Sequence, residues 1–359
     1  MKILLRFLIS GDLQCHNWKQ FSHIREDGIN SRLFNILSVF DKMKFYALKH
    51  SINKALLNGD IFEESDYHLT EIFNAVYRKV VEMREAGMKI AFNLGNHDIL
   101  RWLMDKVIPV HTLVPFEHIA NVIQQPSVLW NHLCVVPYMP AENVKRAVKW
   151  HLDVFPYPNT VLVFHGGVQG ARAGPKRYLV RNPLKLKDLQ PKEWKLILLS
   201  DYHTTQYLRD NVLYIGSPVQ HSFGETHVPG FWDVTLYDKE PWFKLKHVKT
   251  NLPRFIEISV SSMKELKDAE EKIKGNYVRI NLKKEDFVEE AESFATKICA
   301  AVTTRTSQSE KEVTDSARIG AWELSPSQCI QNYVKKTSSE KRKALIRLGQ
   351  ALYEGKIDG

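Results

Sequence analysis

The chain has 359 residues, which is long enough for two domains, or for one large domain with an appendage. Of these residues 44% are hydrophobic and 25% are charged, which is the composition of an ordinary globular protein. The formal net charge of +9 is compatible with a polyanionic partner but does not require one. The four cysteines are scattered and form no CxxC pair, which argues against a disulfide framework or a structural zinc site and favours a reducing compartment.

The apolar beginning of the chain predicts a first strand rather than a signal peptide. Ile3-Leu4-Leu5 is interrupted by Arg6, and the run ends at Gly11-Asp12 without a small-residue cleavage site. No stretch approaches 18 uncharged apolar residues, so we expect no membrane span and no membrane partner.

The first hundred residues alternate between strand and helix patterns. The expected elements are a strand at 3–10, a helix at 29–54, a strand at 55–58, a helix at 68–86 closed by Gly87, and a strand at 88–94. This rhythm predicts a layered α/β fold.

Further strands are expected at 128–138, 160–165, 195–199, 212–215 and 230–237. Beyond residue 250 the pattern changes to strand 255–260, helix 262–274, strand 276–282 and helix 285–302, a compact β-α-β-α unit. Residues 303–317 are low in apolar content, which is typical of a linker. A last helix, capped by Ser338 or Ser339, would place Leu345, Leu348 and Leu352 on one face.

Candidate functional residues follow five of the expected strands. They are Asp12, Asp60, Asn96 with His97, His165, and Asp201 with His203. In open α/β sheets, ligands bind at the carboxyl ends of the strands. Oxygen and imidazole donors that meet there suit a binuclear centre of Mn²⁺, Fe²⁺ or Zn²⁺. Each residue alone could instead cap a helix or be a satisfied core residue.

These motifs resemble those of the calcineurin-like metallophosphoesterases, whose pattern runs D-x-H, G-D, G-N-H-D, H and G-H-x-H. Within that group the chain is similar to the SbcD-type nuclease subunits of DNA double-strand-break repair complexes, in cellular or phage form. The closer features are Gly59-Asp60-Ile61-Phe62-Glu63, Tyr214-Ile215-Gly216-Ser217-Pro218 and Phe223-Gly224-Glu225.

The resemblance implies a fold, a domain order and a compartment. The fold is a layered metallophosphoesterase β-sandwich flanked by helices, with a small α+β capping domain and a helical tail. The implied parts are a nuclease domain at 1–248, a capping domain at 249–302, a linker at 303–320 and a partner-binding tail at 321–359. The expected location is cytoplasmic, or intracellular in the host if the protein is phage-encoded.

The resemblance also implies roles for the candidate residues. Asp12 and His203 would hold a first metal ion, Asn96, His165 and Asp201 would hold a second, and Asp60 would bridge both. Two Mn²⁺ ions are expected, with Mg²⁺, Fe²⁺ or Zn²⁺ as substitutes. His97 would protonate the leaving oxygen or stabilise the transition state, and Asp98 would orient His97.

Two positions depart from the family pattern. Gln14 replaces the His of D-x-H, and Asp201 replaces the first His of G-H-x-H. Asp201 is a competent ligand, because an anionic oxygen suits Mn²⁺. The neutral amide of Gln14 is a weak donor, so the first metal would be held loosely unless His16 also binds it. Either the centre works with one weak ion, or some activity is lost.

The implied substrate is DNA, and the implied partner is an SMC-like ATPase that binds the C-terminal helix. Arg172, Lys176, Arg177 and Arg181 would track a phosphate backbone, or else lie on a solvated loop. Trp18 and Phe21 would stack on bases, or else belong to the core. A homodimer is also expected.

Three functions remain open from the sequence. The first is a metal-dependent exo- or endonuclease subunit that acts with the ATPase. The second keeps the fold but hydrolyses a small phosphomonoester or phosphodiester. The third is a scaffold that binds DNA ends with weakened catalysis, for which Gln14 is the best evidence. The tail helix could likewise pack on its own domain instead of a partner.

Overall fold

The computed structural model describes residues 1–67, 69–100, 109–154, 161–174, 178–179, 184–284 and 286–306. These residues form two six-stranded sheets, a three-stranded sheet and a two-stranded ribbon. The ribbon consists of β8 (Arg172–Ala173) and β9 (Tyr178–Leu179). Short 3-10 helices lie at Val114–His118 and Leu186–Leu189.

The first sheet contains the beginning of the chain. Its strands, in spatial order, are β14 (Phe243–Lys249), β13 (Gly230–Tyr237), β1 (Ile3–Ser10), β2 (Lys54–Asn58), β3 (Lys89–Asn93) and β4 (Asn121–Ile123). The four strands from β1 to β4 are parallel, and β13 runs antiparallel to β1. The carboxyl ends of β1, β2 and β3 therefore meet at one edge.

The second sheet repeats this arrangement. Its strands, in spatial order, are β11 (Gln206–Arg209), β12 (Val212–Tyr214), β10 (Leu196–Ser200), β7 (Val161–His165), β6 (Leu133–Val136) and β5 (Ser127–Leu129). The four central strands are parallel, and the two edge strands are antiparallel to their neighbours. The central strands read as continuous apolar runs because both faces of the sheet are buried.

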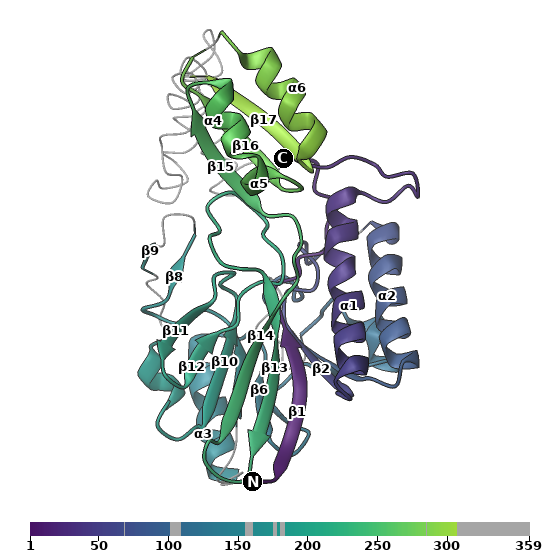
Figure 1. Ribbon diagram of the computed structural model, residues 1–359. Coiled ribbons are helices and arrows are strands. Elements are labelled where there is room, and N and C mark those ends of the chain that lie inside the picture. The colour runs from purple at the N-terminus through teal and green to yellow at the C-terminus, as the bar shows by residue number, and fades with distance from the viewer. Residues whose placement is uncertain are drawn as a thin grey trace, which may run out of the picture.

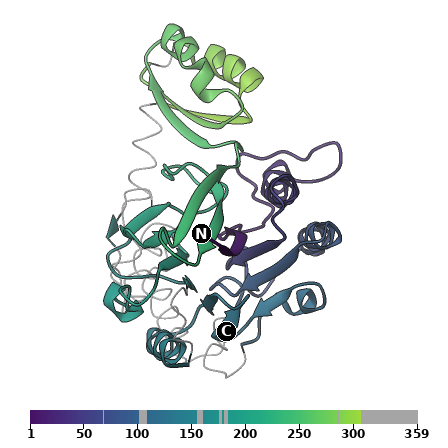
Figure 2. The same ribbon diagram turned by 60° about the horizontal axis from the view of Figure 1, so that its bottom comes forward.

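Alternating side chains divide the core into layers. Leu5, Phe7 and Ile9 of β1 pack between the two sheets, whereas Leu8 points to the outer face. On that outer face lie α1 (Ser31–Lys49) and α2 (Thr70–Glu85). Helix α3 (Ala141–Val154) covers the outer face of the second sheet. The result is a four-layer α/β/β/α sandwich, with helices on both sides (Figures 1 and 2).

A separate three-stranded unit follows the sandwich. Strands β15 (Phe255–Val260), β16 (Tyr277–Leu282) and β17 (Ala301–Thr306) are parallel. Helices α4 (Met263–Asp268), α5 (Glu270–Ile273) and α6 (Val288–Ile298) complete it, with a hydrophobic cluster of its own. Figure 1 shows this unit at the end of the sandwich opposite the N-terminus.

The expected fold class agrees with this architecture, with corrections at particular elements. The helix expected at 29–54 ends at Lys49. The single strand expected at 128–138 is the hairpin β5–β6, because Trp130 and Asn131 adopt left-handed φ angles of 51° and 63° at its turn. Residues 303–306, which were expected to begin a linker, instead belong to β17, which continues to Thr306 and pairs with β16.

Several other elements were not expected from the sequence: α3, β4, β8, β9, β11, β14 and the two 3-10 helices. The rest of the linker and the whole tail, with Leu345, Leu348 and Leu352, lie outside the described residues. In the described part of the chain, no helix combines the length and hydropathy needed to cross a membrane.

Candidate metal centre

The centre lies where the carboxyl edges of the two sheets meet. Asn58, the last residue of β2, joins them: its side-chain Nδ2 lies 3.2 Å from the Phe164 carbonyl oxygen and 2.9 Å from Ser200 Oγ. Asn93, the last residue of β3, donates in turn to Asn58 Oδ1 at 2.8 Å. This buried amide network fixes the strand ends that carry the candidate ligands.

Two glycines let the ligand loops approach closely. A Cβ added at Gly59 would lie 2.0 Å from His165 Nδ1, and one added at Gly95 would lie 2.1 Å from Asp60 Oδ1. Gly59 also adopts a left-handed φ of 86°. The glycines of the Gly59-Asp60 and Gly95-Asn96 motifs are therefore needed for the geometry of the site.

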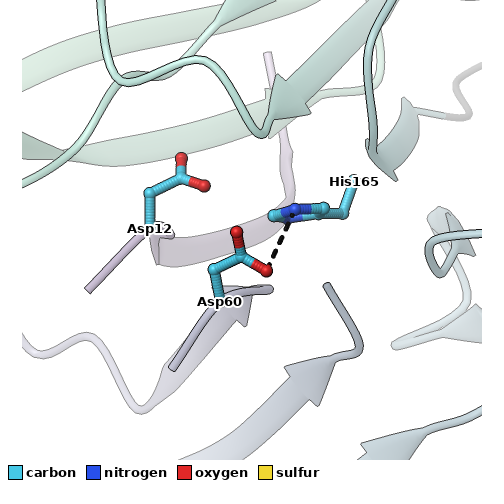
Figure 3. Close-up of side chains that lie close together, drawn as sticks. All are labelled: Asp12, Asp60 and His165. Atoms are coloured by element: carbon cyan, nitrogen blue, oxygen red, sulfur yellow. Dashed lines mark ion pairs between the residues drawn. The ribbon is translucent and has the colours of Figure 1, made fainter. Parts of the chain in front are cut away.

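Asp12, Asp60 and His165 form the middle of the centre. The three side chains lie close together (Figure 3). One ligand atom from each lies within 4.8 Å of the others, and all three side chains are buried. His165 Nε2 is 3.3 Å from Asp60 Oδ1 and 3.1 Å from Asn96 Oδ1. The main-chain N–H of Asp201 donates to Asp12 Oδ1 at 3.1 Å. The side chains of Asp12, Asp60, Asn96 and His165 and the main chain of Asp201 thus lie together at this edge.

Each histidine of the centre is held through Nδ1. His165 Nδ1 donates to the Asn58 carbonyl oxygen at 2.8 Å, and His203 Nδ1 pairs with Glu225 Oε1 at 3.1 Å. His97 Nδ1 donates to the Glu63 carbonyl oxygen. This pattern fixes the rings and leaves Nε2 as the atom of each ring that could bind a metal ion or transfer a proton.

Several candidate ligands have strained backbone angles. The φ angles of Asp12, Gln14 and Asp60 are 53°, 46° and 55°, and that of Asp201 is 104°. Left-handed φ is uncommon for residues with side chains and costs about 1–3 kcal/mol each when the surroundings impose it. The two ligand loops impose it on each other, because Asp12 N–H donates to the Gly59 carbonyl and Gln14 N–H to the Asp60 carbonyl. Strain concentrated at these turns marks a functional site.

The charges of the centre are those of a cation site. Burial, reinforced by the nearby carboxylates of Asp60 and Asp201, raises the pKa of Asp12 to about 7. Burial opposes a charge on His165 as well, but Asp60 and Asp12 outweigh it and raise the His165 pKa. A divalent cation would stabilise the buried carboxylates directly. The oxygen donors of Asp12 and Asp60 and the imidazole of His165 fit Mn²⁺, Fe²⁺ or Zn²⁺.

The expected role of Asp98 is wrong. Its carboxylate accepts from the main-chain N–H groups of Gly95, Asp60 and Ile61, at 2.8, 2.8 and 3.1 Å. It therefore holds the turn of Asp60, and the Glu63 carbonyl orients His97 instead. Three converging N–H groups satisfy a buried carboxylate better than one imidazole does, which explains the difference.

A cleft of about 240 Å³ opens beside the centre. Asp201 and His203 line it together with Arg172, Tyr202, Thr204 and Ser222. Gln206 fixes the main chain of Arg172 through two hydrogen bonds, of 2.9 and 2.8 Å. Arg172 thus stands at a cleft shared with two candidate ligands, whereas Lys176, Arg177 and Arg181 lie outside the described residues.

The remaining expected residues lie nearby in different surroundings. Gln14 is buried on the loop after Asp12. The ring of His16 packs 5.2 Å from that of Trp18, and among the described residues it is not in the ligand cluster. Trp18 and Phe21 pack against protein groups, Arg32 and Phe223 respectively, which favours the core interpretation over base stacking.

Sequence reasoning missed two residues of the site. Glu225 was noted only as part of a family motif, yet it is nearly buried and pairs with His203. Burial opposes its charge, but His203 lowers the Glu225 pKa to about 2. Asn58 was read only as a strand end, and its role in joining the two sheets was missed. Asn58 and Asn93 are each the last residue of a strand, in the adjacent strands β2 and β3. That repeated asparagine was the available signal.

No family model matches the chain. A protein of Invertebrate iridescent virus 3, named "Putative phosphoesterase 078R", is 21% identical over 226 residues, which are 61% of this chain. The matched part spans 60% of that relative's length. Among solved structures, a dimetal phosphatase from Danio rerio aligns with a TM-score of 0.38 and 9% identity, covering 69% of this chain and 97% of that one.

Proposed function

We propose that the chain is a metal-dependent phosphoester hydrolase. The observation that carries this proposal is the approach of Asp12, Asp60 and His165 within 4.8 Å, on the strand ends of two different sheets. The viral relative, which is named as a phosphoesterase, supports the same reaction class. Two bound divalent cations would polarise the phosphoester and help to ionise the attacking water.

The ligand positions are assigned as two overlapping sets. Asp12 and His203 would hold the first cation, and Asn96, His165 and Asp201 would hold the second. Asp60 would be the ligand shared by both sets, because its Oδ1 lies 3.3 Å from His165 Nε2 and it belongs to the same cluster as Asp12. Glu225 keeps the His203 ring in place, and the Asn58 carbonyl does the same for His165. Mn²⁺ suits this set of oxygen and imidazole donors, and Mg²⁺, Fe²⁺ or Zn²⁺ could replace it.

His97 is the proposed proton donor to the leaving oxygen. Its main-chain N–H donates to Asp60 Oδ1 at 3.0 Å, which places the residue beside the bridging ligand. Because Nδ1 is engaged by the Glu63 carbonyl, Nε2 is the atom that transfers the proton. Asp98 supports this step only indirectly, by holding the main chain of Gly95 and Asp60.

The proposed substrate is a DNA phosphodiester. Arg172 shares a cleft with Asp201 and His203, so its guanidinium could bind the phosphate next to the scissile one. The net charge of +9 favours the same class of polyanion. A small phosphoester would also fit a cleft of about 240 Å³, which makes it the second candidate.

We also propose a DNA-end-processing complex, in which the chain is a homodimer and its C-terminal helix binds an SMC-like ATPase. The apolar stripe of Leu345, Leu348 and Leu352 supports the helix contact from the sequence alone.

The substrate classes are separated by one comparison. The full-length protein with Mn²⁺ is assayed on linear duplex DNA, on bis(p-nitrophenyl) phosphate and on p-nitrophenyl phosphate. Arg172→Ala should raise KM for DNA and leave the small diester unaffected. Arg209→Ala, on the exposed strand β11, is the matched control and should change neither. Hydrolysis of the small esters without any DNA cleavage would favour the second candidate. Metal binding without hydrolysis of any substrate would indicate the catalytically weakened scaffold.

A further inference from the structure

One loop lies between the metal centre and the three-stranded unit, and we call residues 217–227 the connecting loop. Toward the centre it contacts Asp12 twice: Ser217 Oγ donates to the Asp12 carbonyl oxygen at 2.9 Å, and His221 Nε2 lies 3.1 Å from the same atom. Its Glu225 pairs with His203. The loop thus supports two proposed ligands of the first metal ion.

Toward the three-stranded unit, the loop is anchored by Gln220. This side chain is buried, and its Oε1 accepts from the main-chain N–H of Phe255, the first residue of β15, at 2.8 Å. Its Nε2 donates to the carbonyl oxygens of Glu225 and His227, at 2.7 and 3.0 Å. One amide therefore ties the first strand of the unit to the residue that holds His203.

Aromatic and cationic side chains close the same joint. Arg32 of α1 is buried, donates to the His221 carbonyl oxygen at 2.9 Å and stands 4.9 Å from the Phe255 ring. The Phe223 ring lies 4.9 Å from that of Phe255. The Arg279 guanidinium of β16 stacks on the Phe223 ring, with Cζ 3.9 Å from the ring centroid. The connecting loop is therefore packed against the unit on several sides, so a shift of β15 has to move the loop or break these contacts.

We infer that the connecting loop couples the seating of the three-stranded unit to the metal centre, with Gln220 as the positioning residue. When β15 is seated, Gln220 holds the main chain of Glu225, and Glu225 holds the His203 ring. When the unit shifts, Phe255 withdraws its N–H from Gln220, and the support of His203 loosens. Because coupling of this kind is reciprocal, metal binding should also stabilise the seating of β15. This inference rests on the proposed function.

The test measures both directions on the full chain. Gln220→Met keeps the length of the side chain and removes its three hydrogen bonds. Tyr277→Phe is the matched control, because it removes the 2.7 Å bond from Asn35 to the Tyr277 hydroxyl at the same joint and leaves the three hydrogen bonds of Gln220 in place. Mn²⁺ affinity is measured by calorimetry. Hydrogen exchange of the β15 amides is followed by mass spectrometry with and without Mn²⁺, and thermal unfolding checks that each variant is folded.

In the wild type, Mn²⁺ should slow exchange in β15. Gln220→Met should abolish that slowing and weaken the lower-affinity Mn²⁺ by about 10-fold, which is the usual effect of losing a group that supports a ligand. Tyr277→Phe should keep both properties within about 2-fold. The coupling would be overturned, and the proposed function left standing, by either of two results. One is wild-type protein that binds Mn²⁺ without any change in the hydrogen exchange of β15, and the other is a Gln220→Met variant in which Mn²⁺ slows that exchange as it does in the wild type. A wild type that binds no Mn²⁺ would overturn the coupling together with the proposed function.

Discussion

His165 Nδ1 donates to the main-chain carbonyl oxygen of Asn58 at 2.8 Å, across the junction of the two sheets. This bond turns the opposite ring nitrogen, Nε2, toward Asp60 and Asn96. The backbone of one sheet therefore sets the ring orientation of a proposed ligand carried by the other. A change in the packing of the two sheets would therefore also move a proposed ligand of the centre.

His97→Ala is predicted to separate catalysis from metal binding. The proposed role of His97 is proton transfer to the leaving oxygen, and its ring is held by a carbonyl group. Turnover should fall by about 10²–10⁴-fold, the usual contribution of a general acid, while the Mn²⁺ content stays near that of the wild type. Loss of metal in proportion to activity would make His97 a ligand instead.

The pair of His203 and Glu225 predicts a pH dependence of stability in metal-free protein. Burial opposes the His203 charge, but the hydrogen bond to Glu225 raises its pKa from 6.5 to about 9. The pKa of Glu225 falls from 4.5 to about 2. The pair should therefore stabilise the folded state fully between about pH 4.5 and 6.5. Its contribution is lost as the pH rises through about 9 or falls through about 2.

Glu225→Gln measures that contribution. In the presence of a chelator, its Tm should lie below that of the wild type at pH 6, and the difference should shrink by pH 10. Ser222→Ala, which removes a hydroxyl on the exposed side of Glu225, serves as the control and should show no such convergence. A Tm difference that does not depend on pH would mean that Glu225 acts through packing.

Gln14→His is predicted to tighten the first metal ion. Gln14 is buried on the loop of Asp12, where its amide is a weak donor, and an imidazole is a stronger one. Histidine is among the residues that tolerate a left-handed φ, so the 46° angle is not an obstacle. Calorimetry should show a lower Kd for the weaker Mn²⁺ and an unchanged Kd for the tighter one. Equal affinities in both proteins would show that this position does not face the metal.

Truncation at about residue 320 tests the C-terminal helix. The stripe of Leu345, Leu348 and Leu352 would be costly to expose without a partner surface. The truncated protein should remain folded, bind Mn²⁺ and hydrolyse the small diester, but lose co-purification with the ATPase and ATP-stimulated cutting of duplex DNA. An insoluble or unfolded product would assign the helix to the core of its own chain.

The sequence predicted the strand ends better than the contacts made there. Gly59-Asp60 and Gly95-Asn96 each follow an apolar run, so the positions of Asp60 and Asn96 could be inferred from local pattern alone. The hydrogen-bond partners of Asp98 could not be inferred from local pattern, because they depend on how three main-chain N–H groups turn toward its carboxylate. The link from His203 to Glu225 spans 22 residues and arises only from folding of the connecting loop.

The elements show the same limit. The buried strand β10 was recognisable as an uninterrupted apolar run, whereas β17 (Ala301–Thr306) was divided between the end of an expected helix and the start of an expected linker, because it is rich in threonine and carries Arg305. Its six residues are strand because they pair with β16, a non-local contact. Local composition does not reveal such pairing, since strand propensity depends strongly on the neighbouring strand.

The most direct test of the metal centre is the Mn²⁺ content and diesterase activity of Asp60→Asn beside the wild type. Asp60 is the carboxylate proposed to touch both cations, and it lies in the cluster with Asp12 and His165. The wild type should bind two Mn²⁺ ions per chain and hydrolyse bis(p-nitrophenyl) phosphate, and both properties should collapse together in the variant. A variant that stays within a few-fold of the wild type in both properties would contradict the metal centre proposed at Asp60.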